Sequence, residues 1–187
     1  MTKNYIPLIL FLFCTLFSQA QTVIAKQSFE VLGDTWMPLQ FSTAPCTSGG
    51  DTWNYRSSLR TLLPSEGNQF WGIEDLYGDC GSSDFESIQF PEIDLSLFHD
   101  VALSFEFAVV NFNSTDRINY LLILDNQPQE EVELFIPDGY FNTNGWQKVS
   151  LKIPNNTQKL RLQINVRQNG NEQYAGIDNI LLTGTGI

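Results

Sequence analysis

The sequence predicts an all-β fold: a two-sheet antiparallel β-sandwich of jelly-roll type. Apolar and polar residues alternate with a period of two in the stretches 101–109, 149–153 and 160–166, which is typical of strands with one buried face. Clusters rich in Asn, Gly and Pro separate the strand-like runs and indicate turns. No window shows the sustained periodicity with caps that an α-helix requires.

The expected strands follow one another along most of the chain. Residues 118–124 are apolar on both faces, as in a central strand. Residues 173–182 are equally apolar, although Asp178 and Asn179 stand side by side in their middle. In chain order the expected strands are 27–30, 70–76, 85–90, 101–109, 118–124, 131–136, 148–153, 160–167 and 173–182.

Residues 1–20 have the composition of a secretory signal peptide. Lys3 supplies a positive charge, residues 6–17 form an apolar run, and residues 18–20 (Ser-Gln-Ala) place small side chains at a cleavage site. This run is too short to span a membrane, and no later segment approaches about 18 unbroken apolar residues. We therefore expect cleavage near Ala20 and an exported, soluble protein.

The remaining chain, residues 21–187, has the length of a single domain. The full sequence carries a formal net charge of −11, and loss of Lys3 makes the mature part slightly more acidic. This balance argues against nucleic acid as a partner, because phosphates need a basic protein face. It is compatible with cation binding, with neutral glycans, and with solubility alone.

Two carboxylates stand at the two ends of the mature chain. Asp178 lies within the last expected strand, and Glu30 ends the first. A buried carboxylate needs a partner, and first and last strands often pair in a sandwich, so we expect the two to converge on a structural calcium ion. Calcium takes six to eight oxygen ligands, for which Asp51 and Asp75 are loop candidates. The alternative is that Asp178 accepts backbone hydrogen bonds in a turn while Glu30 is solvated.

Two cysteines remain after the expected cleavage, Cys46 and Cys80. An even pair in an exported protein predicts a disulfide. It would close a loop of about 35 residues and stabilise the fold by roughly 3–4 kcal/mol in the chain-entropy model. Both cysteines lie in Gly- and Ser-rich surroundings without a nearby histidine, so we favour a disulfide over a metal site.

The region 42–83 differs from the rest of the chain. It is rich in Gly, Ser, Asp and aromatic residues and has poor periodicity. Long loops at the end of a sandwich are where function usually lies, so we expect ligand binding to be carried by residues 51–79. A ring can cover the apolar face of a sugar while polar neighbours fix its orientation. The candidates are Trp53 first and Tyr77 second, with Asp51, Asn54 and Arg56 as polar partners; core packing is the alternative for Trp53.

Short motifs spread over most of the mature chain form a combination of their own. They are Ser28-Phe29-Glu30, Trp36, Gly67-Asn68-Gln69-Phe70-Trp71-Gly72, the run 101–107, Gly145-Trp146 and the run 175–180. This combination resembles the galactose-binding-like jelly rolls, which include calcium-containing carbohydrate-binding modules and MAM-type adhesion domains. The resemblance implies a structural calcium near the first and last strands, with Glu30 and Asp178 as ligands. It transfers no sugar site onto named residues.

Catalysis is not indicated by any residue pattern. The one histidine is His99, and no Gly-x-Ser-x-Gly motif is present, so a histidine-dependent triad is not expected. No carboxylate pair is singled out for glycoside hydrolysis. We expect a non-catalytic, exported binding module whose partner is carbohydrate or a cell-surface glycan. The alternatives are a small polysaccharide hydrolase or lyase on a β-sandwich scaffold, and a purely structural accessory domain of a larger secreted system.

Overall fold

The computed structural model describes residues 21–30, 32–41, 52–76, 85–136, 139–168, 170 and 172–187. Four of the residues singled out by the sequence, together with the expected signal peptide 1–20, lie outside these ranges. These residues are Asp51, Tyr77, Cys46 and Cys80. The disulfide, the signal peptide and the ligand roles of Asp51 and Tyr77 therefore stay predictions.

The described residues form β-strands and contain no helix. Accordingly, no helix that could cross a membrane is found in this part of the chain. The strands are β1 (Thr22–Gln27), β2 (Gln40–Phe41), β3 (Thr52–Arg56), β4 (Phe70–Glu74), β5 (Glu86–Gln89), β6 (Ile93–Asp94), β7 (Phe98–Val110), β8 (Arg117–Leu124), β9 (Gln127–Pro128), β10 (Val132–Glu133), β11 (Gln147–Lys152), β12 (Lys159–Arg167) and β13 (Tyr174–Gly186).

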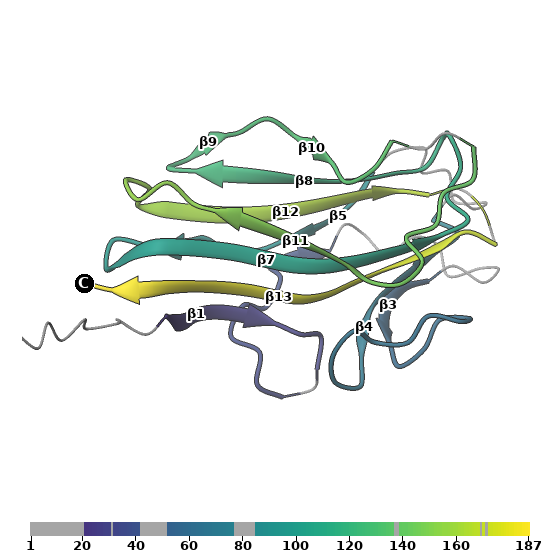
Figure 1. Cartoon of the computed structure of the whole chain (residues 1–187), viewed down its shortest axis with the longest axis horizontal. Coiled ribbons are helices and arrows are strands. Elements are labelled where there is room, and N and C mark those ends of the chain that lie inside the picture. The colour runs from purple at the N-terminus through teal and green to yellow at the C-terminus, as the bar shows by residue number, and fades with distance from the viewer. Residues whose placement is uncertain are drawn as a thin grey trace, which may run out of the picture.

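The strands form two antiparallel sheets packed as a sandwich (Figure 1). The first sheet has the order β11-β7-β13-β4-β3, and β1 also pairs with β13. The second sheet has the order β10-β8-β12-β5-β2, with β6 paired to β12 and β9 paired to β8. In Figure 1, β8 and β12 lie above β7 and β13. The predicted all-β, two-sheet antiparallel sandwich is confirmed.

Alternation along the strands places the main core between the sheets. On β12, Leu160, Leu162 and Ile164 are almost fully buried, whereas Arg161 and Gln163 between them are partly exposed. Successive side chains of a strand point to opposite faces of its sheet, so this pattern buries one face of β12 and leaves the other partly open to solvent. The period of two in the sequence therefore predicted the correct face of this strand.

The first and last strands are neighbours, as predicted. Gln27 of β1 lies opposite Ile180 of β13. The edge of β13 that pairs with β1 also pairs with β4, nearer the start of β13, where Ile177 lies opposite Trp71. The change of partner from β4 to β1 coincides with a bulge after Asp178. A bulge at this point separates β1 from β4 and opens room for side chains between them.

A second, smaller apolar cluster covers the outer face of the first sheet. On β4, Phe70 belongs to this cluster while its neighbour Trp71 belongs to the main core, as alternation requires. The segment after β3 crosses this face and contributes Leu59 and Leu62. Trp146 closes the cluster, and its ring Nε1–H donates to the backbone oxygen of Leu63 at 2.9 Å.

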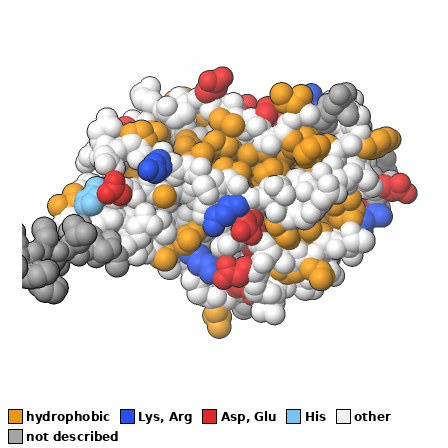
Figure 2. All heavy atoms as spheres, viewed as in Figure 1, with side chains coloured by type: hydrophobic (Ala, Val, Ile, Leu, Met, Phe, Trp, Pro, Cys, Tyr) orange, Lys and Arg blue, Asp and Glu red, His pale blue; other side chains and the backbone are white. Residues whose placement is uncertain are grey.

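The sandwich is open along one side, at β11 and β10. A cleft of about 500 Å³ runs there between the two sheets. Phe107, Tyr120, Phe141 and Val149 are among the side chains that line it, and all four also belong to the main core or pack against it. Figure 2 shows hydrophobic side chains at the surface along this side. The cleft is thus lined by side chains of the main core that are accessible between the edge strands β10 and β11.

Candidate functional site

Trp53 lies in the core rather than in a ligand-binding loop. Residues 52–56 form β3, which pairs with β4 so that Trp53 lies opposite Ile73. The Trp53 side chain is 7% exposed, and its ring packs edge-on against Trp71 with centroids 5.5 Å apart. Because β3 extends the sheet, its alternate side chains face the core. This corrects the expectation that Trp53 stacks on a sugar; the core-packing alternative holds.

Asn54 and Arg56 face away from Trp53. Asn54 is exposed, and Arg56 runs over Gly72, where an added Cβ would lie 2.6 Å from its Cγ. One Nη of Arg56 donates to Thr52 Oγ1 at 2.9 Å. The expected group of Trp53, Asn54 and Arg56 is therefore divided between the two faces of β3 and does not form one site.

Asp178 is fully buried and accepts hydrogen bonds from a turn. Its Oδ2 accepts from the backbone N–H and the hydroxyl of Ser65, both at 2.9 Å, and from the backbone N–H of Glu66 at 3.3 Å. Its Oδ1 accepts from the backbone N–H of Asn179 at 2.7 Å. Burial raises the pKa of Asp178 to about 6, although these hydrogen bonds lower it. The carboxylate therefore holds the turn at a cost in desolvation.

Glu30 accepts hydrogen bonds from the other end of the same turn. It follows β1 rather than ending it, because β1 stops at Gln27. Its Oε1 accepts from the backbone N–H groups of Asn68 and Gln69 at 2.5 and 2.9 Å, and the first of these is the main reason why the pKa of Glu30 is lowered. Gly67 has φ +70, and a Cβ there would lie 2.2 Å from the Glu30 carboxylate. Glycine is therefore needed at this position.

The turn 65–69 thus brings the two expected calcium ligands to one place. In the described part of the chain, no lysine or arginine forms an ion pair with Asp178. The described residues also contain no group of three or more acidic, His or Cys side chains able to hold a metal. Asp75 follows the far end of β4 from Phe70, so it is not beside Asp178. A cation here would have two carboxylates and would need backbone or water oxygens for its remaining ligands.

A pocket of about 370 Å³ opens at one end of the sandwich. We call it the end pocket. Small-molecule sites usually measure roughly 300–1,000 Å³, so the end pocket can hold one or two sugar rings. Its lining residues come from the segments after β7, before β11 and between β12 and β13. Those that the structure describes are Asn111, Tyr140, Gly170, Glu172 and Gln173.

A buried glutamine fixes the loop that forms one wall of the end pocket. Gln168 is 1% exposed. Its Nε2 donates to the backbone oxygens of Gly170 and Gln173, the latter at 2.8 Å. Its Oε1 accepts from the backbone N–H of Leu76 at 3.2 Å. One side chain therefore closes the loop on itself and ties it to the end of β4.

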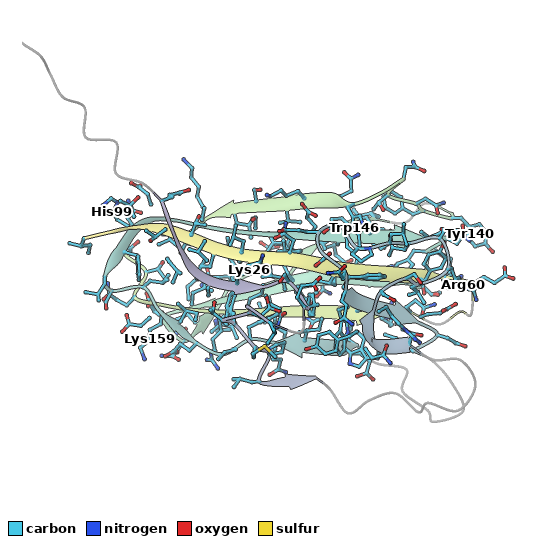
Figure 3. The ribbon with its side chains drawn as sticks, turned by 90° about the horizontal axis from the view of Figure 1, so that it is seen from below. Lys26, Arg60, His99, Tyr140, Trp146 and Lys159 are labelled. Carbon is cyan, nitrogen blue, oxygen red and sulfur yellow. The ribbon has the colours of Figure 1, made fainter. Side chains whose placement is uncertain are left out.

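Tyr140 forms the opposite wall and extends into solvent. Its neighbour Phe141 exchanges two backbone hydrogen bonds with Phe112, at 2.6 and 3.1 Å, and stacks on Phe135 with centroids 4.7 Å apart. Tyr140 itself is 76% exposed and lies at one end of the molecule in Figure 3. A firmly packed neighbour thus presents an aromatic ring to solvent beside the pocket.

Polar groups complete the end pocket. Asn111 has φ +58, and its Nδ2 donates to the backbone oxygen of Glu172 at 3.3 Å. Gln173 Oε1 is buried and has no hydrogen-bond partner among the described residues. An unpaired buried acceptor costs about 1–3 kcal/mol. The arrangement of a ring with amides and a carboxylate suits a polyhydroxylated ligand.

The described lining of the end pocket contains one carboxylate. That carboxylate is Glu172, whereas hydrolysis of a glycosidic bond uses two carboxyl groups. His99 lies at the opposite end of the molecule from Tyr140 (Figure 3), where its Nδ1 is 2.9 Å from Asp100.

The end pocket lies at the same end of the sandwich as the expected binding loops but is lined by other residues. Thr52 and Glu74, at the borders of the expected loops, lie opposite each other at the end where Tyr174 begins β13. The end pocket is at this end but is built from other segments. A signal was available in the sequence, because Tyr140 and Gln173 come soon after Pro-Asp-Gly at 137–139 and Asn-Gly-Asn at 169–171, which are both turn-forming sequences.

Neither a family model nor a curated protein matches the chain. Solved structures do. The K3 cleaved adhesin domain of Lys-gingipain from Porphyromonas gingivalis W83 has a TM-score of 0.53 at 11% identity, covering 88% of this chain and 99% of that one. The K1 domain of the same protein has a TM-score of 0.50 at 14% identity, covering 89% and 99%.

A carbohydrate-binding module of lichenase 5A from Cellvibrio mixtus, solved with cellotriose, has a TM-score of 0.44 at 13% identity, covering 88% of this chain and 99% of that one. The chain shares its two-sheet jelly-roll fold with the K3 and K1 adhesin domains. The fold expected from the terminal-strand motifs is therefore confirmed. At these identities the likeness concerns the fold, and the binding role has to be argued from the site.

Proposed function

We propose that this protein is an exported, non-catalytic module that binds carbohydrate, either free or on a cell surface, through the end pocket. The observation that carries the proposal is one small pocket whose described lining places the exposed Tyr140 ring together with amide and carboxylate side chains. A pyranose has an apolar C–H face and a rim of hydroxyl groups. The ring can cover the first, and Asn111, Glu172 and Gln173 can bind the second.

The fold agrees with a binding role. The two similar structures with the higher TM-scores are described as adhesin domains, and the expected signal peptide 1–20 would deliver the protein to where such partners are found. The single carboxylate among the described lining residues supports binding over hydrolysis. Incubation with polysaccharides should accordingly release no reducing ends; release would favour the hydrolase alternative.

Replacement of the ring tests this proposal. A glycan array followed by calorimetry on residues 21–187 should identify a bound sugar. Tyr140→Ala should then weaken that binding by about 1–3 kcal/mol, the scale of a lost large side-chain contact. Circular dichroism should stay unchanged because the Tyr140 side chain is 76% exposed.

Leu97→Ala is the matched control for this variant. Leu97 is also highly exposed, at 71%, and is not among the described residues of the end pocket. It should bind the sugar as the parent does. Binding by Tyr140→Ala at the parent's affinity would place the site elsewhere.

We also propose a structural calcium ion between Glu30 and Asp178. Two observations support it: both carboxylates reach the turn 65–69, and Asp178 is buried without an ion-pair partner among the described residues. Calcium would supply the missing positive charge and would join the first and last strands through the turn. Backbone carbonyls and water would supply its remaining oxygens.

A further inference from the structure

We propose that the end pocket prefers sugars that carry a protonated amine over their N-acetylated or neutral counterparts; this inference rests on the proposed function. The described lining residues contain one carboxylate, Glu172, and no lysine or arginine. The pocket therefore carries a negative charge that its described lining does not balance. A glycan with an ammonium group would bring that balance itself.

The hydrogen-bonding groups of the pocket point to the same ligand. An ionised carboxylate accepts hydrogen bonds and donates none. An ammonium group has three donors, a positive charge and no acceptor, so it suits the Glu172 carboxylate. An N-acetyl group at the same carbon has one donor and no charge, so it loses the attraction to this carboxylate.

The aromatic wall adds a second attraction for a cation. The face of a tyrosine ring is electron-rich and attracts ammonium groups within about 6 Å of its centre. Tyr140 is 76% exposed, so its face is available to a ligand. A neutral sugar would gain only the apolar contact with the same ring.

A nearby arginine does not cancel the negative charge of the pocket. Arg60 lies toward the same end of the molecule as Tyr140 (Figure 3), but it forms an ion pair with Glu74 and lies 5.9 Å from the centre of the Tyr174 ring. The whole chain has a net charge of −11, and such a field attracts cations and repels acidic polysaccharides. Local and overall charge therefore favour the same class of ligand.

Calorimetry on residues 21–187 tests this preference with three tetrasaccharides of equal length. These are the glucosamine tetramer, its fully N-acetylated form and cellotetraose, compared in mildly acidic buffer so that the amines are protonated. The glucosamine tetramer should bind about tenfold more tightly than either of the others, the combined scale of a partly exposed ion pair and a cation–π contact. The ratio should shrink as salt is added.

A charge-removing variant assigns the preference to the pocket. Glu172→Gln should lower the ratio of the affinities for the glucosamine and N-acetylglucosamine tetramers severalfold, whatever happens to the absolute affinities, and the contact with the Tyr140 ring should account for the preference that remains. Glu130→Gln makes the same change of charge at an exposed residue outside the described pocket lining, and it should leave the ratio as in the parent.

Each outcome decides a different question. Equal binding of the three tetramers by the parent, or an unchanged ratio in Glu172→Gln, would overturn the preference while the proposed carbohydrate binding stands. Binding of none of the three, together with no bound glycan on an array, would overturn the proposed function and the preference with it. A ratio that falls equally in Glu130→Gln would show that only the overall charge matters and would also overturn the inference.

Discussion

Two loops of this protein are each held by one or two side chains, but they leave different groups unpaired. The turn 65–69 is held by the carboxylates of Glu30 and Asp178, which meet its N–H groups. The loop 170–173 is held by the amide of Gln168, which meets its carbonyl oxygens. At the turn, the carboxylate of Asp178 has no cation beside it among the described residues. At the loop, Gln173 Oε1 has no donor among the described residues.

The difference separates a stabilising contact from a binding one. The turn links the two terminal strands through groups that are buried or paired, so its contacts act on the free energy of unfolding. The end pocket includes the Tyr140 ring, which is exposed to solvent, so a ligand can contact it. Variants in the two places should therefore change different measurements.

Asp178→Ala should have the largest effect on stability. It leaves the N–H groups of Ser65 and Glu66 without their acceptor, at about 1–3 kcal/mol each, and relief of the desolvated charge offsets part of this. We expect the free energy of unfolding in urea to fall by about 3 kcal/mol in calcium-free buffer. Glycan affinity at the end pocket should stay as in the parent. A fall in affinity with little loss of stability would reverse the roles assigned to the two loops.

Calcium should raise the melting temperature. The gain in the free energy of unfolding should be comparable in size to the loss expected for Asp178→Ala. A ligand that binds only the folded state stabilises it by about 2.7 kcal/mol at a concentration of one hundred times its dissociation constant. Scanning calorimetry with added calcium and after chelation measures the shift. Asp178→Asn should abolish it. Identical melting with and without calcium would leave the carboxylates as acceptors for the turn alone.

Gln168→Ala should have a smaller effect on stability but should also weaken glycan binding. It leaves the N–H of Leu76 and two carbonyl oxygens without a partner, which should lower the free energy of unfolding by about 2 kcal/mol. The loop that carries Gln173 should then lose its shape, and glycan affinity should fall. Urea unfolding and calorimetry measure the two quantities. A variant that loses stability but keeps full affinity would show that the loop is not part of the site.

Much of the fold could be predicted because it depends on local patterns. The alternation at 101–109 and 160–166 assigned the buried faces of β7 and β12 correctly, since a strand with one buried face must repeat every two residues. The pairing of β1 with β13 was also predicted, and the two carboxylates expected to converge bind opposite ends of the turn 65–69. Local alternation cannot predict which strands pair. That prediction came from the motifs of the terminal strands and their resemblance to a known fold.

The tertiary structure alone decided which aromatic residues are available to a ligand. Trp53 lies in a polar, glycine-rich region that resembles a binding loop, yet β3 pairs with β4 and buries its ring against Trp71. Tyr140 follows the sequence Pro-Asp-Gly, yet its side chain stays exposed while its neighbour Phe141 packs against the core. Burial of a ring depends on which strand lies opposite, and that is not a property of the residues next to it.

The end pocket is the clearest case of a site that only folding creates. Its described walls come from residues far apart in the chain, such as Asn111, Tyr140 and Gln173, and Leu76 shapes it through Gln168. Each of these residues is unremarkable in its own stretch. Their chemistry comes from amide and carboxylate side chains placed together with an exposed ring, and whether a polar atom is paired depends on every group that folding brings within hydrogen-bonding distance.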